Sequence, residues 1–148
     1  MDLSKFKWPV IILVVVVVLW LMSNGGVDYM FRSFTENTPG EDAARDAADE
    51  SGLSKLGGFL MYTFRYEKAM KVFEVAIERY PNGPNRIYNY YRLAKCYEKM
   101  DRYAESSNIL RDLMYMGAHD KDDRVPQYDV LKLRRDKLIE VHELGEIR

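Results

Sequence analysis

The stretch RYEKAMKVFEVAIERYP, residues 65–81, decides how the chain folds. Ala69, Phe73 and Ala76 are spaced four and three residues apart, so they lie on one face of a helix. Pro81 ends the segment, because proline has no backbone N–H with which to continue a helix. The stretch therefore predicts an amphipathic helix, which belongs either to an ordinary core or to a repeated unit that presents a surface.

Helical periodicity continues through the second half of the chain, and no segment alternates as a half-buried strand does. Turn residues at 82–85 and Gly117 separate the helical segments. The predicted helices span residues 51–64, 66–80, 86–100, 101–116 and 127–144. The apolar side of the last of them is predicted to consist of Val130, Leu131, Leu133, Leu138, Ile139 and Val141. The sequence therefore predicts an all-α fold of short antiparallel helices.

The second pair of helices repeats the first pair with a shift of 37 residues, as from Phe73 to Leu110. The shift places Leu56 on Leu93, Gly57 on Ala94, Leu60 on Tyr97, Tyr66 on Tyr103, Ala69 on Ser106, Phe73 on Leu110, Ala76 on Leu113 and Pro81 on Ala118. Small residues such as Gly57 and Ala94 let two helices approach closely, and large residues such as Phe73 fill the space between helix pairs. The repeated unit is a helix, a tight turn and a second helix.

These positions resemble the tetratricopeptide repeat, whose pattern is Leu-Gly and Tyr in one helix and Ala, Phe, Ala and Pro in the next. The first copy has Leu53, Leu56, Gly57, Leu60, Tyr66, Ala69, Phe73, Ala76 and Pro81, and the second has Tyr90, Leu93, Ala94, Tyr97, Tyr103, Ser106, Leu110 and Leu113. The resemblance covers residues 50 to about 120. It implies a short α-solenoid of two repeats, with the last helix as a solvating cap. A generic helical bundle is the alternative.

The resemblance also implies where a partner binds. The first helices of such pairs line a face that holds an extended peptide or a partner helix. The predicted partner-binding groove consists of Met61, Tyr62, Tyr88, Tyr91, Arg92, Lys95 and Lys99. The alternative is that these tyrosines pack against a neighbouring helix and that the cations are ordinary surface charge. Ser54 and Gly58 occupy two positions at which the members that grip acidic chaperone tails carry lysine or asparagine.

The N-terminal residues 1–26 are typical of a membrane anchor. Trp8 to Met22 form an uninterrupted apolar run, about 22 Å long as a helix, and lipid contact is predicted for residues 6–22. Lys5 and Lys7 precede the run, so the positive-inside rule places the N-terminus in the cytoplasm and the remainder outside. In a bacterium this is the inner membrane with the domain in the periplasm, and in an organelle the matrix side takes the N-terminus. A cleaved signal peptide is the alternative, because the run is short.

Three parts are predicted along the chain: an anchor at 1–26, an acidic juxtamembrane linker at 27–50 and a repeat-like helical domain at 51–148. Within the linker, Pro39 and Gly40 break the chain, and the residues after them form either a short helix with an acidic first turn or a flexible segment.

Composition and isolated reactive residues exclude several kinds of function. The 22 basic and 23 acidic residues nearly balance, which argues against nucleic acid as the partner. Cys96 is the single cysteine, so it forms no internal disulfide or zinc site, and it is either a small buried hydrophobe or a reactive thiol. His119 and His142 stand apart from any nucleophile in the sequence, and no metal, cofactor or catalytic site is predicted.

The sequence therefore predicts a single-pass membrane protein whose soluble repeats bind a partner protein and which is not an enzyme. Two repeats are few for an independent solenoid. This predicts an accessory subunit or assembly factor of a larger membrane complex. The alternative is a receptor or chaperone-like module that captures extended segments of translocated proteins.

Overall fold

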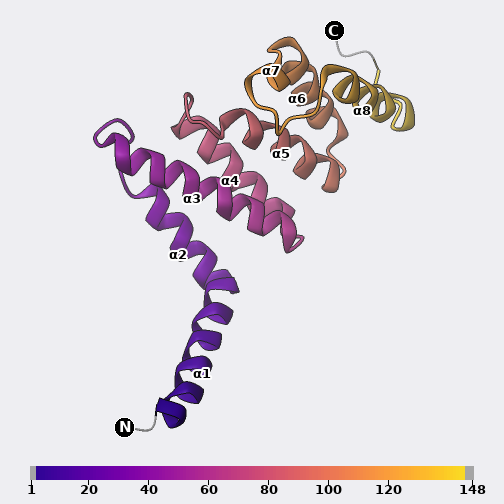
Figure 1. The fold of residues 1–148 in the computed structure, drawn as a ribbon. Coiled ribbons are helices and arrows are strands. Elements are labelled where there is room, and N and C mark those ends of the chain that lie inside the picture. The colour runs from indigo at the N-terminus through magenta and orange to yellow at the C-terminus, as the bar shows by residue number, and fades with distance from the viewer. Residues whose placement is uncertain (1–2, 146–148) are drawn as a thin grey trace. The chain divides into compact units, whose positions relative to one another are not determined.

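The computed structural model describes residues 3–145, and their side chains from Lys7 onward. Within this range the chain forms eight helices and no strand, so the all-α prediction is confirmed (Figure 1). The helices are α1 (Leu3–Met22), α2 (Asn24–Thr35), α3 (Ala43–Tyr62), α4 (Tyr66–Arg79), α5 (Arg86–Lys99), α6 (Tyr103–Tyr115), α7 (Ala118–Lys121) and α8 (Tyr128–Val141). The chain divides into two compact units, Met1–Asn37 and Thr38–Arg148.

The first unit consists of α1 and α2, which meet at a sharp break. Ser23 Oγ donates a hydrogen bond to the Trp20 carbonyl oxygen (2.6 Å) and accepts one from the Gly26 N–H (3.3 Å), which caps the start of α2. A Cβ atom at Gly26 would overlap the backbone of Trp20 and Leu21, so only glycine allows this close approach. The two helices are bent by 74° at this point.

The predicted single transmembrane helix is not confirmed. Among the described residues, no helix is both long and apolar enough to cross a membrane by itself. The segments Lys7–Met22 and Asn24–Thr35 reach that length and hydropathy only as a bent pair.

The second unit is built from helix pairs that pack in chain order. Helix α3 packs against α4, α4 against α5, α5 against α6, and α6 against α8. Most residues of the repeated pattern form the core: Leu53, Leu56, Leu60, Ala69, Phe73, Ala76, Leu93, Ala94, Tyr97, Ser106, Leu110 and Leu113 are all buried. Tyr66 and Tyr103 are half-buried, and Pro81 is exposed. This serial packing with one repeated core confirms the helical-repeat prediction.

Close packing within the first pair depends on Gly57. A Cβ atom there would overlap the ring of Phe73, with Cζ only 2.7 Å away, so the ring occupies the space that a side chain on α3 would need. The interpretation of Gly57 as a packing residue is confirmed. In the second pair Ala94 and Leu110 take the corresponding places, and both are fully buried.

Both pairs turn in the same way. Phe64 adopts a left-handed backbone with φ of 60°, and the Arg65 N–H donates to the Leu60 carbonyl oxygen at 2.8 Å. In the second pair Asp101 has φ of 58°, and the Arg102 N–H donates to the Tyr97 carbonyl oxygen at 2.9 Å. These six-to-one hydrogen bonds around a left-handed residue are Schellman motifs, which end helices α3 and α5.

Helix α3 begins well before the predicted start of the domain at residue 51. Asp42 caps it by accepting hydrogen bonds from the N–H groups of Ala44 (2.9 Å) and Arg45 (3.3 Å). Asp46, Asp49 and Glu50 are therefore part of α3, and the predicted boundary between 50 and 51 falls inside this helix.

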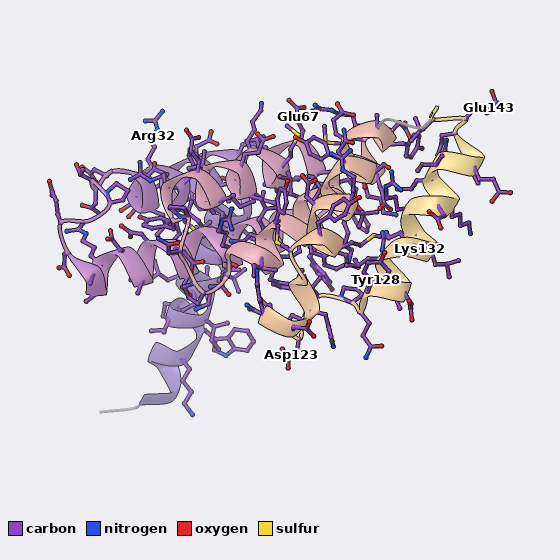
Figure 2. The ribbon with its side chains drawn as sticks, turned by 90° about the horizontal axis from the view of Figure 1, so that it is seen from above. Arg32, Glu67, Asp123, Tyr128, Lys132 and Glu143 are labelled. Carbon is purple, nitrogen blue, oxygen red and sulfur yellow. The ribbon has the colours of Figure 1, made fainter. Side chains whose placement is uncertain are left out.

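The apolar side predicted for the last helix is wrong in part. Only Leu131 is buried, whereas Val130, Leu133 and Val141 are exposed, Leu133 at 72 %. The reason is that α8 packs on α6 from one side, and within residues 38–145 no further helix packs extensively on its opposite side. Lys132 on α8 and Glu143 just after its end, both labelled in Figure 2, are exposed, as expected of a helix that closes the array toward solvent.

Candidate partner-binding face

Five of the predicted groove residues lie together on one face of α5. Tyr88, Arg92, Lys95 and Lys99 are spaced by three or four residues, and Tyr91 lies three residues after Tyr88 and four before Lys95, which brings their side chains to one side of the helix. We call this surface the α5 face. Tyr91 is buried, Tyr88, Arg92 and Lys95 are half-buried, and Lys99 is exposed.

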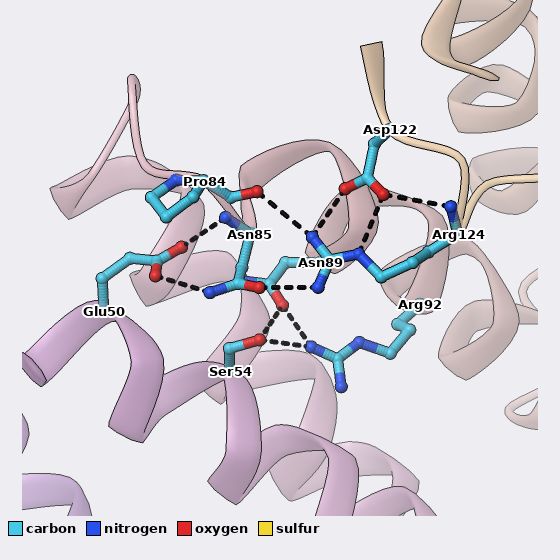
Figure 3. Close-up of polar contacts among 8 residues, drawn as sticks. All are labelled: Glu50, Ser54, Pro84, Asn85, Asn89, Arg92, Asp122 and Arg124. Carbon is cyan, nitrogen blue, oxygen red and sulfur yellow. Dashed lines mark hydrogen bonds and ion pairs between the residues drawn. The ribbon is translucent and has the colours of Figure 1, made fainter. Parts of the chain in front are cut away.

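Arg92 is the centre of the α5 face. Its guanidinium lies over the rings of Phe73 (4.6 Å to the centroid) and Tyr88 (4.4 Å). Its Nη2 donates to Ser54 Oγ of α3 and to the side-chain oxygen of Asn89 (Figure 3). Aromatic rings and neutral acceptors are its partners, and no carboxylate within residues 7–145 forms an ion pair with it.

The environment of Arg92 disfavours its positive charge. Burial, together with the nearby charge of Arg124, lowers the pKa of Arg92 to about 10. Its Nε atom is buried and makes no hydrogen bond in the described part of the chain. A half-buried cation without a counter-ion gains strongly from an added carboxylate.

Small residues of α3 make room for Arg92. A Cβ atom at Gly58 would lie 2.8 Å from Arg92 Nη1, so a larger side chain at that position would displace the guanidinium. Ser54 accepts its hydrogen bond from the same α3 face. The two positions that differ from the lysine and asparagine of tail-gripping relatives thus serve here to seat an arginine from the neighbouring repeat.

Helix α8 adds a second arginine to this region. Arg134 forms two 2.7 Å contacts with the Glu98 carboxylate, through Nε and Nη2, and its Nη1 donates to the Tyr91 hydroxyl at 3.4 Å. Lys95 Nζ lies over the Tyr91 ring, 5.4 Å from the centroid. Burial lowers the pKa of Lys95, and the neighbouring charge of Arg134 adds to that shift. Positive charge is therefore concentrated along the α5 face.

A comparison with known protein families finds matches for two segments of the chain, residues 53–83 and 88–115. Each of these segments matches the family model described as tetratricopeptide repeat. Residues 53–115 form two tetratricopeptide-like repeats. The first repeat coincides with the C-terminal half of α3 and all of α4, and the second with most of α5 and all of α6, so the resemblance read from the sequence is confirmed for this region. No curated protein and no solved structure matches the chain.

The connection between the repeats forms a polar bridge that sequence reasoning missed. The buried Glu50 carboxylate accepts hydrogen bonds from the backbone N–H (2.9 Å) and the side-chain amide (2.7 Å) of Asn85. The Asn85 side-chain oxygen accepts from Arg124 Nη1 at 2.8 Å, and Arg124 pairs with Asp122 at 2.7 Å (Figure 3). The hint of this bridge in the sequence is Gly83, which lies in the turn. A Cβ atom at Gly83 would lie 2.9 Å from Glu50 Oε1, so a larger residue there would crowd the Glu50 carboxylate.

Arg124 also reaches the α5 face, which nothing in the sequence indicated. Its guanidinium lies 4.7 Å from the centroid of the Tyr88 ring, the ring that Arg92 also contacts. The predicted residues Met61 and Tyr62 lie elsewhere, at the C-terminal end of α3, where Met61 is half-buried and Tyr62 exposed. The structure thus brings Arg124 and Arg134 to the predicted groove residues of α5.

The reactive residues singled out from the sequence have structural contacts. His119 Nδ1 lies 2.7 Å from the Val125 carbonyl oxygen, beside a pocket of about 390 Å³ between α6, α7 and α8. The His142 ring stacks on Tyr103 at 3.5 Å. Cys96 is fully buried, and burial raises the pKa of its thiol to about 12, as expected of a small hydrophobe. Among the described residues, no cluster of three or more His, Cys, Asp or Glu side chains is placed to hold a metal ion.

Proposed function

We propose that this chain is a membrane-anchored scaffold protein whose α5 face holds an acidic, extended segment of a partner protein. The tetratricopeptide-like repeats support a role in protein–protein interaction. The observation that carries the acidic specificity is Arg92, a half-buried cation that contacts only aromatic rings and neutral acceptors.

Electrostatics favour a carboxylate ligand over a neutral one. Arg92, Lys95 and Lys99 form no ion pair with a carboxylate inside the described chain, although they share one helix face. A carboxylate bound at Arg92 would offset the burial that lowers its pKa. Charge-assisted hydrogen bonds of this kind are among the stronger ones in protein interfaces.

Membrane association is supported by the side chains of α1. Every residue from Trp8 to Trp20 is exposed in the structure, and the run holds no charged group. The two lysines before it support an orientation with the repeats on the outer side of the membrane, by the positive-inside rule. We propose that the repeats act there as an accessory subunit or assembly factor of a larger complex, which requires a fixed stoichiometry with the partner.

Site-specific photo-crosslinking in the cells that make the protein tests the binding face. The photoreactive residue p-benzoylphenylalanine replaces Lys95 on the α5 face or, as a matched control, the exposed Glu78 on α4. We expect one protein to be crosslinked at 95 and not at 78, through a segment rich in aspartate or glutamate. Crosslinking of many unrelated proteins at 95 would favour the receptor or chaperone-like role, and equal crosslinking at both positions would contradict a specific binding face.

A further inference from the structure

The turn between α3 and α4 carries an unexpected residue. Phe64 holds the left-handed position of the Schellman motif, with φ of 60°, a position that favours glycine and tolerates asparagine or aspartate. The equivalent residue of the second repeat is Asp101, with φ of 58°. Both turns close with the same hydrogen bonds, so the backbone does not require phenylalanine at the first of them.

Phe64 is not explained by packing either. Its side chain is 78 % exposed, and that of Tyr62, at the end of α3, is 84 % exposed. The Phe64 ring meets Tyr66 edge to face, with centroids 6.2 Å apart. We call these three residues the tip aromatics. A phenylalanine in strained backbone and in water is unfavourable on both counts, which indicates that its side chain contacts something outside the described chain.

The second turn has the opposite chemistry. Lys99, Asp101 and Arg102 stand there in place of Tyr62, Phe64 and Arg65. The Asp101 carboxylate accepts a hydrogen bond from the Tyr103 hydroxyl at 2.5 Å, and Arg102 pairs with Glu105 at 2.8 Å. One turn of the array is therefore aromatic, and the other is charged, with Asp101 and Arg102 held by contacts within the chain.

We propose that the tip aromatics insert into the headgroup layer of a lipid bilayer. Tyrosine and phenylalanine suit this layer, because a ring can enter the apolar boundary while a hydroxyl stays in contact with water. The same chain carries the exposed apolar run of α1, which is itself proposed to enter a bilayer. The inference rests on the membrane association proposed above.

The contact would give the repeats a defined orientation at the membrane. Residues 36–42 join α2 to α3, so only a short non-helical segment connects the two units. The aromatic turn would face the bilayer, and the charged turn, one repeat further on, would stay in water.

A fluorescent reporter beside each turn tests the proposal on the full chain. Thr63→Cys and Met100→Cys place a thiol one residue before Phe64 and Asp101, and each is labelled with the environment-sensitive dye NBD. The native Cys96 is fully buried, so it does not compete for the dye, and the unsubstituted chain checks this. The labelled chains are reconstituted into vesicles of phosphatidylcholine and phosphatidylglycerol, and flotation of the vesicles reports membrane association separately.

We expect the dye at 63 to shift to the blue, to be quenched by headgroup-region nitroxide lipid and to be protected from aqueous iodide. The dye at 100 should remain open to iodide. Adding Phe64→Asp, which copies the second turn, should return the dye at 63 to water without lowering the thermal stability of the chain.

Three results would overturn the proposal. A chain that floats with vesicles while the dye at 63 stays open to iodide refutes membrane contact at the turn and leaves the anchor intact. A dye at 63 that is protected from both iodide and nitroxide lipid shows that protein, such as a second copy of the chain, covers the turn. A chain that does not float removes both the proposed anchor and the inference that rests on it.

Discussion

The first and second repeats share their packing and differ in their surfaces. Gly57 and Phe73 in the first pair correspond to Ala94 and Leu110 in the second, and all four are buried. On the α5 face, Tyr88, Tyr91 and Lys95 correspond to three small residues of α3, namely Ser51, Ser54 and Gly58. The positions that hold the helices together are repeated, whereas these three positions of the proposed binding face are not.

The difference between the two surfaces follows from the way the repeats pack on each other. Ser54 bonds Arg92, and Gly58 leaves space for its guanidinium, so the small surface of one repeat seats the large side chains of the next. At the position of Arg92 the first copy carries Lys55, which is exposed, so the second copy differs in partly burying its cation against the preceding repeat. Comparing equivalent positions therefore separates structural residues from candidate binding residues within a single chain.

The largest effect is expected at the shared core. Phe73→Ala removes a fully buried ring between α3 and α4, and we expect the free energy of unfolding to fall by about 3–5 kcal/mol. Phe64→Ala, which removes an exposed ring in the same repeat, should change it by less than about 0.5 kcal/mol. Urea unfolding followed by circular dichroism measures both. Equal losses would show that the two phenylalanines do not differ in burial as described.

Adjacent glycines of α3 sharpen the comparison between packing and surface. Gly57→Ala drives a methyl group into the Phe73 ring and should destabilise the chain by about 1–3 kcal/mol. Gly58→Ala meets only the end of the flexible Arg92 side chain, so it should be neutral or raise stability, by up to about 1 kcal/mol through helix propensity. The same urea experiment compares the two. A Gly57→Ala chain as stable as Gly58→Ala would contradict the close approach of α3 and α4.

A smaller effect depends on pH and arises in the second repeat alone, where Cys96 takes the place of Phe59. Burial raises the pKa of this thiol from 9.0 to about 12, so the folded chain keeps a proton that the unfolded chain loses. Its contribution to stability is complete below pH 9 and is lost as the pH rises toward 12. At pH 10 the loss is at most about 1.4 kcal/mol.

Cys96→Ala tests this assignment. The variant should lose less stability than the parent chain between pH 8 and pH 10, as measured by urea unfolding at each pH. Other groups, such as Tyr97 with its pKa raised by burial, contribute to both chains alike and cancel in the difference. If both chains lost the same stability, the thiol would titrate normally and Cys96 would not be shielded as the structure has it.

The sequence predicted the repeated core because burial there follows helical spacing, as at Ala69, Phe73 and Ala76. It could not predict the contributions of Arg124 and Arg134, since both come from outside the repeats and reach α5 only through the tertiary fold. The prediction of a buried apolar side for the last helix failed for a similar reason. Val130, Leu133 and Val141 follow an apolar pattern, yet whether such a pattern is covered depends on a neighbouring helix, which a pattern alone does not reveal.

The most direct test of the central claim compares how much partner protein the chain retains with and without the Arg92 side chain. The protein crosslinked at position 95 is co-purified in mild detergent with the unsubstituted chain, with Arg92→Gln, and with Lys71→Gln, which removes an exposed α4 lysine already paired with Glu67. We expect Arg92→Gln to weaken binding roughly tenfold or more, equivalent to at least about 1.4 kcal/mol, in a chain that circular dichroism shows to be folded at the temperature of the experiment. Lys71→Gln should retain the full amount of partner. Wild-type retention by Arg92→Gln would contradict the claim that the second repeat binds an acidic segment through this cation.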